Sequence, residues 1–128
     1  MMRLNGLGLT VNGTFVSASD RNVKENFHAI DAKAVLEKVA ALPLSEWNYK
    51  ADTTSRHIGP MAQDFHAAFG VGPDDKHIAT VDADGVALAA IQGLNQKLEE
   101  QGAALKSKDA RIAVLEQRLS AIESLLQK

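Results

Sequence analysis

The 128-residue chain contains no cysteine. This absence excludes disulfide bonds, zinc sites built on thiolates, and cysteine nucleophiles. Its histidines, His28, His57, His66 and His77, are scattered along the sequence, and no two of them have the spacing of paired metal ligands on a helix. The sequence therefore predicts no metal site and no cofactor.

The chain also lacks a long hydrophobic run and an excess of charge of one sign. Its longest purely apolar run covers residues 86–91, which is far too short to cross a bilayer. The first residues lack the apolar core of a signal peptide. The net charge is -2 with both signs dispersed, and such a surface attracts neither nucleic acid nor an anionic membrane. We expect no nucleic-acid partner and no membrane insertion.

A seven-residue repeat of apolar residues fills the last third of the chain, from about Val86 to Lys128. Heptad positions a and d are apolar except at Gln101 and Lys108, and a stripe this narrow is typical of a coiled-coil seam. The seam residues, for which we expect a role in oligomerisation, are Ile91, Leu94, Leu98, Leu105, Ile112, Leu115, Leu119, Ile122 and Leu126.

The charges beside the seam indicate what the helix pairs with. Arg111 and Arg118 occupy g positions, and Glu116 and Glu123 occupy the following e positions, so parallel copies in register could form ion pairs. We therefore expect self-association, although mixed Ile and Leu at a and d leave the number of copies open. The alternative is a helical hairpin broken near Gly102, where the glycine costs about 1 kcal/mol.

The rest of the chain predicts an α+β fold in three parts. Residues 1–18 are rich in glycine and β-formers, and Asn12-Gly13 predicts a hairpin that pairs 9–11 with 14–16. This part is either a hairpin packed on the body or the C-terminal stub of a β-rich passenger. Residues 19–85 are expected to form a small globular domain, and residues 86–128 the oligomerisation helix.

Within the globular part, Asp31 is expected to cap a helix whose apolar residues recur at helical spacing. The helix must end before Pro43. Residues 44–50 alternate as a strand does, and the polar residues 51–56 form a loop.

A second short helix is expected to begin with Pro60 at its first position and to end at Gly70. Residues 77–82 are a candidate short strand. Asp84 and Gly85 are then a turn that serves as the hinge into the oligomerisation helix.

Four sequence blocks, in this order, resemble the intramolecular chaperone domain, peptidase family S74. They are SDRNVKEN at 19–26, LPLSEWNY at 42–49, IGPMAQDF at 58–65 and VALAAIQGL at 86–94. Domains of this family lie at the C-terminus of phage endosialidases, tail spikes and tail fibres, and one is also found in the myelin regulatory factor. The chain departs from the family at Asp64, where glutamate is common, and no catalytic residue is affected.

The resemblance implies a homotrimer that guides folding of the upstream β-rich passenger of the same chain and then cuts itself away. The family makes the cut with a serine and a lysine five residues later, which correspond here to Ser19 and Lys24, and the scissile bond is Ala18–Ser19. It thus implies a single-turnover autoproteolytic serine peptidase in a phage virion or tail, or in a bacterial surface protein, with a soluble released domain.

The chemistry of such a cut sets conditions on its surroundings. A serine hydroxyl is a weak nucleophile until a base takes its proton, and a free lysine amine is almost wholly protonated at neutral pH. Desolvation, or a cation such as Arg21, would favour the neutral amine, whereas Asp20 and Glu25 nearby would oppose it. The serine oxygen could attack the preceding carbonyl and give an ester for water to open, but the sequence does not select the route.

The spacing of the two residues adds a constraint. Side chains five residues apart are about 140° out of line on a helix and on opposite faces of a strand. A turn after Ser19, or a neighbouring subunit, must therefore bring Lys24 to the hydroxyl, and the cut could depend on assembly. Two other readings remain: a trimerisation module that registers chains without cutting, and a coiled-coil adaptor for a different protein.

Overall fold

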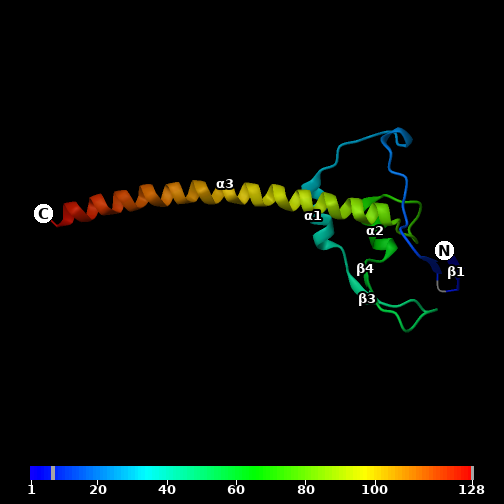
Figure 1. Ribbon diagram of the computed structural model, residues 1–128. Helices are drawn as coiled ribbons and strands as arrows, with labels where there is room; N and C mark the ends of the chain where they lie inside the picture. The colour runs from blue at the N-terminus through cyan, green and yellow to red at the C-terminus, as the bar shows by residue number, and fades with distance from the viewer. Residues whose placement is uncertain (7, 128) are drawn as a thin grey trace.

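Helix α3 (Thr80–Leu126) is 47 residues long and projects far beyond the rest of the chain (Figure 1). In the computed structural model, which describes residues 1–6 and 8–127, it runs unbroken through Gly102. At 1.5 Å per residue its length is about 70 Å. The predicted continuous helix is confirmed and the helical hairpin is not formed; Lys128, the last residue of the predicted helix, lies outside the described residues.

The start of α3 differs from the prediction. The helix begins at Thr80, so the strand expected at 77–82 does not form, and Asp84 and Gly85 are helical instead of a hinge. Asp82 places a negative charge in the first turn, where the helix dipole favours it. A short alternating segment without a neighbouring strand gains no ladder hydrogen bonds, so the helix is preferred there despite the glycine.

Helix α1 (Ala32–Ala41) packs across the N-terminal half of α3, as Figure 1 shows. The Asp31 side chain accepts a hydrogen bond of 3.2 Å from the Ala34 N–H and so caps the helix as predicted. The helix ends at Ala41, and Leu42 is extended ahead of Pro43. Both predicted ends of this helix are confirmed.

Small residues make the contact between α1 and α3. Ala32, Ala89, Ala90 and Gly93 are buried there, which lets the two backbones approach closely. A Cβ atom at Gly93 would lie 2.7 Å from the Ala32 carbonyl carbon and 3.0 Å from the Leu36 Cβ, and closer still to the Ala32 carbonyl oxygen. The close approach therefore requires a glycine at position 93.

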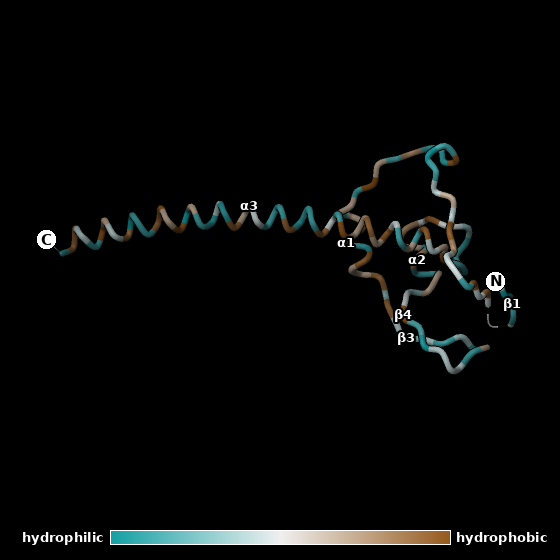
Figure 2. The backbone as a smooth tube through the Cα atoms, in the orientation of Figure 1, coloured by the Kyte–Doolittle hydropathy of each residue, from teal (hydrophilic) through white to brown (hydrophobic). Residues whose placement is uncertain are grey.

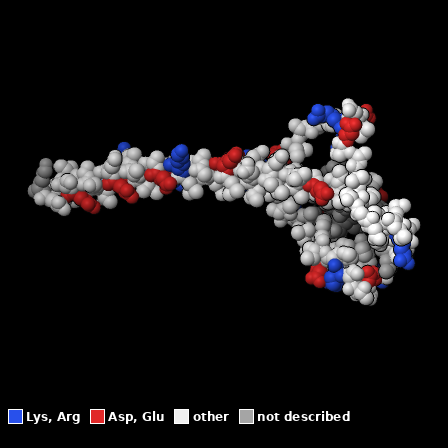
Figure 3. Space-filling model, viewed as in Figure 1, with Lys and Arg blue, Asp and Glu red and all other residues white. Residues whose placement is uncertain are grey.

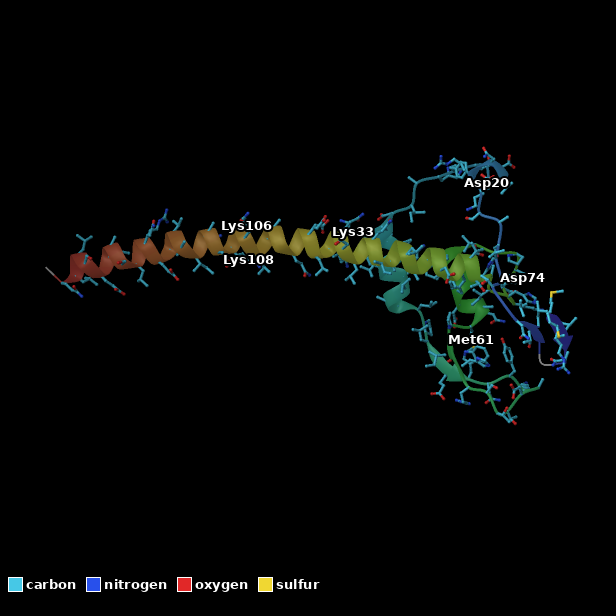
Figure 4. All side chains as sticks on the ribbon, in the orientation of Figure 1. Asp20, Lys33, Met61, Asp74, Lys106 and Lys108 are labelled. Carbon is cyan, nitrogen blue, oxygen red and sulfur yellow. The ribbon has the colours of Figure 1, made fainter. Side chains whose placement is uncertain are left out.

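Two ion pairs lie at the margin of this contact. Lys33 Nζ lies 2.7 Å from a carboxylate oxygen of Glu100, and Lys97 Nζ lies 3.9 Å from one of Glu37 (Figure 4 labels Lys33 beside α3). The Glu100 carboxylate raises the pKa of Lys33, by its hydrogen bond first and its charge second. Both pairs are solvent-exposed and orient α1 along α3 more than they stabilise it.

Helix α2 (Ala62–Phe69) lies below α3 and carries Phe65, which is buried and only 4% exposed. The Phe65 and Phe69 rings pack with centroids 4.9 Å apart. Gly70 ends the helix in the left-handed conformation, as predicted, with φ 64°. The helix begins two residues later than predicted, because Pro60 and the capping residue Met61 remain extended.

A short antiparallel hairpin lies beneath α2. Strand β3 (Ser45–Trp47) pairs with β4 (His57–Gly59), so only part of the predicted strand at 44–50 forms, and the loop at 51–56 is confirmed. The Trp47 ring lies 4.9 Å from the rings of both Tyr49 and His57. This aromatic cluster holds the hairpin where the strands are too short to do so alone.

The first hairpin forms in a different register from the one predicted. Strand β1 (Met2–Asn5) pairs with β2 (Gly8–Val11), Met2 opposite Val11 and Asn5 opposite Gly8. The chain therefore reverses between residues 5 and 8, and the predicted pairing of 9–11 with 14–16 across Asn12-Gly13 is wrong. Residues 2–5 form the strand that pairs with β2, because they suit β-structure and are followed by a glycine-containing turn.

The contact at Gly93 can be tested against a second glycine of the same helix. Gly93→Ala should lower the free energy of unfolding by about 1–3 kcal/mol, because the new methyl group meets the α1 backbone. Gly102→Ala meets nothing within 4 Å and should raise it by about 0.5–1 kcal/mol. Denaturant unfolding at one fixed protein concentration measures both; equal effects of the two substitutions would contradict the packing.

Asp52 provides a test by pH. The hydroxyl and N–H of Thr54, at 2.7 and 3.0 Å from Asp52 Oδ1, lower the pKa of Asp52 from 3.8 to about 2. Because this pKa is depressed by folding, the loop gains stability above the unfolded value near 3.8 and loses it as the pH falls through about 2. Thr54→Ala should move the Asp52 midpoint upward in an NMR titration of the carboxyl carbon. A parent midpoint at the unfolded value would refute the interaction.

Candidate active site

An arm without strand leads from β2 to α1 and carries both predicted catalytic residues. It leaves the body, turns at its outermost point and returns to the start of α1 (Figures 1 and 4, where Asp20 is labelled at the turn). The turn is one short 3-10 helix, η1 (Arg21–Val23). The Asp20 carboxylate caps it by accepting hydrogen bonds from the backbone N–H and side-chain amide of Asn22, at 3.0 and 3.1 Å.

This turn brings Ser19 and Lys24 together. Lys24 Nζ donates a hydrogen bond of 2.7 Å to Ser19 Oγ. The Val23 and Lys24 N–H groups bond back to the carbonyls of Asp20 and Arg21, which folds the chain tightly enough for the contact. The sequence required either a turn or another subunit to join the two residues, and the structure joins them by a turn within one chain.

Both members of the pair are accessible. Ala18, Ser19 and Lys24 are all exposed, as is every other residue of the arm between 12 and 31. A serine oxygen next to an amine at this distance can lose its proton to the amine when the amine is neutral. The arrangement thus has the two groups that a serine–lysine cleavage needs, adjacent to the peptide bond predicted to be cut.

The pair lies at the edge of a cleft of about 530 Å³ between the arm and the first turns of α3. The arm contributes Phe15, Ser17, Ser19 and Lys24, and α3 contributes Thr80, Val81, Asp84, Gly85 and Leu88. The α3 residues were missed from the sequence. Nothing in the sequence predicts that the start of α3 faces the arm, because residues 80–85 were interpreted as the end of a strand and a hinge.

The nine predicted seam residues all lie on α3, and their exposed fractions range from 49% at Leu94 to 80% at Leu126. Figure 2 shows apolar and polar residues alternating along the projecting part of the helix. Figure 3 shows basic and acidic side chains interspersed there, with no large patch of one sign on the visible face. The single chain leaves its apolar seam uncovered.

Other candidate sites add no chemistry. His77 Nδ1 lies 2.9 Å from Asp74 Oδ1, and the pKa of Asp74 is lowered by its hydrogen bonds, first from the Lys76 N–H and then from His77. Among residues 1–6 and 8–127, no three histidine, aspartate or glutamate side chains gather as a metal site would require. None of the helices in this described part has the length and apolar character needed to cross a membrane.

Comparison with known proteins identifies the segment that holds the pair. Residues 19–71 match the family model described as chaperone of endosialidase, Peptidase_S74. The match begins at Ser19 and covers the rest of the arm from there, α1, the second hairpin and α2. A search of curated proteins finds no significant match. Residues 19–71 of this chain are therefore a domain of the chaperone-of-endosialidase family, peptidase S74.

Proposed function

We propose that this chain is a C-terminal intramolecular chaperone that trimerises through α3, assists assembly of an upstream β-rich fibre or spike segment, and then cuts itself at Ala18–Ser19. The observation that carries the proposal is the 2.7 Å hydrogen bond from Lys24 Nζ to Ser19 Oγ, at the residue where the family match begins. The family also favours a phage-associated protein, and residues 1–18 would be the end of the passenger.

The packing of α1 supports self-association through the seam. With Ile91 at heptad position a, the residues of α3 that contact or pair with α1 fall at c, f and g. Positions c and f lie away from the seam of a and d residues, and position g lies beside it. The residues on this covered side are Ala89, Ala90, Gly93, Lys97 and Glu100. The head therefore covers α3 mainly on the side away from the seam, and the seam residues from Ile91 onward stay exposed, which supports their pairing with sister helices.

Burial of the seam supplies the driving force for assembly. Each large aliphatic side chain that is fully removed from water contributes about 1.5–3 kcal/mol, and nine such positions are available on every copy. The charged pairs Arg111 with Glu116 and Arg118 with Glu123 then favour parallel copies in register. Such a bundle would hold three passenger chains side by side, which is the task of an assembly chaperone.

The geometry of the pair supports a cut in two steps. Neutral Lys24 takes the proton of the Ser19 hydroxyl while Oγ attacks the Ala18 carbonyl carbon, and the lysine returns the proton to the Ser19 nitrogen as the C–N bond breaks. The product is an ester between Ala18 and Ser19 Oγ, with a free amine on Ser19. Water then opens the ester, leaving a carboxylate on Ala18 and restoring the Ser19 hydroxyl.

Self-cleavage is tested by the mass of the purified chain. The parent should yield a 110-residue product, the 128 residues less the first 18. Ser19→Ala and Lys24→Ala should each reduce its formation by about a thousandfold or more, because one lacks the nucleophile and the other the base. Ser107→Ala and Lys106→Ala are matched controls on the projecting part of α3 and should cut like the parent (Figure 4 labels Lys106).

Denaturing mass spectrometry over prolonged incubation follows the product. If the parent and the Ser19→Ala chain both stay at full length, the peptidase proposal is wrong, and registration of three chains remains as the function.

Assembly is tested by a matched pair of substitutions two residues apart on α3, one in the seam and one outside it. Ile112→Asp places a charge in the seam and should convert trimer to monomer at micromolar concentration, because a buried unpaired charge costs several kcal/mol. Val114→Asp changes an equally apolar residue at a c position, which is 48% exposed, and should leave the trimer intact. Sedimentation equilibrium measures both; a monomeric parent would refute the proposed trimer.

A further inference from the structure

The cleft beside Ser19 holds one acidic side chain without a partner. Asp84 lines the cleft together with Ser19 and Lys24. Among the described residues of the cleft wall, Lys24 and Asp84 carry the ionisable side chains. Within residues 1–6 and 8–127, the Asp84 carboxylate takes part in no hydrogen bond or ion pair. Asp20, the other carboxylate next to Ser19, already accepts two bonds from Asn22.

We infer that Asp84 is the binding site for the new N-terminus that self-cleavage creates, and that it pairs with the Ser19 ammonium in the cut chain. The inference rests on the proposed function. Before the cut the Ser19 nitrogen is a neutral amide, and after it the same nitrogen is a free amine that carries a positive charge at neutral pH. The cut therefore creates a cation at the edge of a cleft whose only carboxylate is unpaired.

The surroundings keep the new ammonium in the cleft. Ser19 becomes the first residue of the product, and its hydroxyl accepts the hydrogen bond from Lys24. The next residue, Asp20, caps η1 and so fixes the backbone that follows Ser19. Asp84 belongs to the interior of α3 and cannot swing away with a loop. The negative charge released on Ala18 departs with the passenger, which leaves the ammonium free to pair with Asp84.

The consequence is a product that differs from its precursor in electrostatics. In the uncut chain Asp84 lies at a heptad a position, and within residues 1–6 and 8–127 it forms no ion pair, although Lys24 lines the same cleft, so sister copies would bring unpaired carboxylates toward one another. In the cut chain each carboxylate gains its own cation. Cleavage thus removes a repulsion at the head of the bundle and favours the product state over rejoining.

The test compares Asp84→Asn with Asp82→Asn, two residues apart on α3. Asp82 lines a different cleft with Phe69 and Val71, and is the matched control. Each experiment starts from the full-length chain, which is incubated until it has cut itself. The cut chain is then treated with an amine-acylating reagent at neutral pH. An ion pair holds the Ser19 amine protonated, so its acylation should be about two- to fivefold faster in Asp84→Asn than in the parent, and unchanged in Asp82→Asn.

The Met1 amine of the released fragment is the internal reference for the reagent. Molar salt should abolish the difference between parent and Asp84→Asn, because the pair is solvent-exposed. The second readout is thermal stability: Asp84→Asn should lower the melting temperature of the cut chain but not that of the uncut Ser19→Ala chain. Asp82→Asn should change both forms alike.

The outcomes separate the two proposals. If the parent gives no 110-residue product, self-cleavage and the role of Asp84 both fail. If the product forms but the Ser19 amine reacts equally in parent and Asp84→Asn, the role of Asp84 is overturned and the cut stands. An Asp84→Asn chain that does not cut at all would also overturn the inference, which assigns Asp84 to the product and not to the reaction.

Discussion

The backbone of α1 can lie against α3 only because position 93 carries no side chain, and the arrangement of the molecule depends on that contact. Small residues bring the two helices together on the back of α3, where Ala32, Ala89 and Ala90 are buried. The arm that precedes α1 carries Ser19 and Lys24 to a cleft shared with the first turns of α3. One close contact thus sets the position of both the seam and the cleft.

A chain so thinly packed leaves much of its apolar surface in water. Its buried apolar residues are Ala32, Phe65, Ala89 and Ala90 in the part described, while large aliphatic side chains remain in water along the whole of α3. Domains of this size normally bury well over half of the surface that the unfolded chain exposes. Here large apolar side chains are exposed on the first hairpin and the arm as well as along α3, and on α3 they include the nine seam residues.

The sequence predicted those elements whose signals are local and strong. The continuous helix from residue 86 onward, the Asp31 cap and the Gly70 terminus each depend on residues within one or two turns, and all form where expected. The errors arose where two local signals competed. Asn12-Gly13 is a good reversal, but the chain reverses between residues 5 and 8, and the alternating residues at 77–82 lacked a partner strand and became the start of α3.

The residues of the candidate site also fall into two groups, those predicted from local sequence and those found only in the structure. Ser19 and Lys24 were available from sequence because motif and spacing lie within one short segment. Asp84 and Thr80 were not, because their nearness to the arm arises from the packing of α1 on α3 and has no counterpart in local sequence. Resemblance to a family supplied the first two residues, and only the three-dimensional arrangement supplied the others.

The turn at η1 has a consequence for the order of events in folding. The contact between Lys24 and Ser19 spans five residues and closes a very small loop, so its entropic cost is low and it can form before any distant part of the chain has packed. The hydrogen bond between Lys24 and Ser19 can therefore form early in folding. If the chain cuts itself as proposed, forming the pair would not delay the cut, and any delay would have to come from slower, intermolecular steps that change the surroundings of the pair.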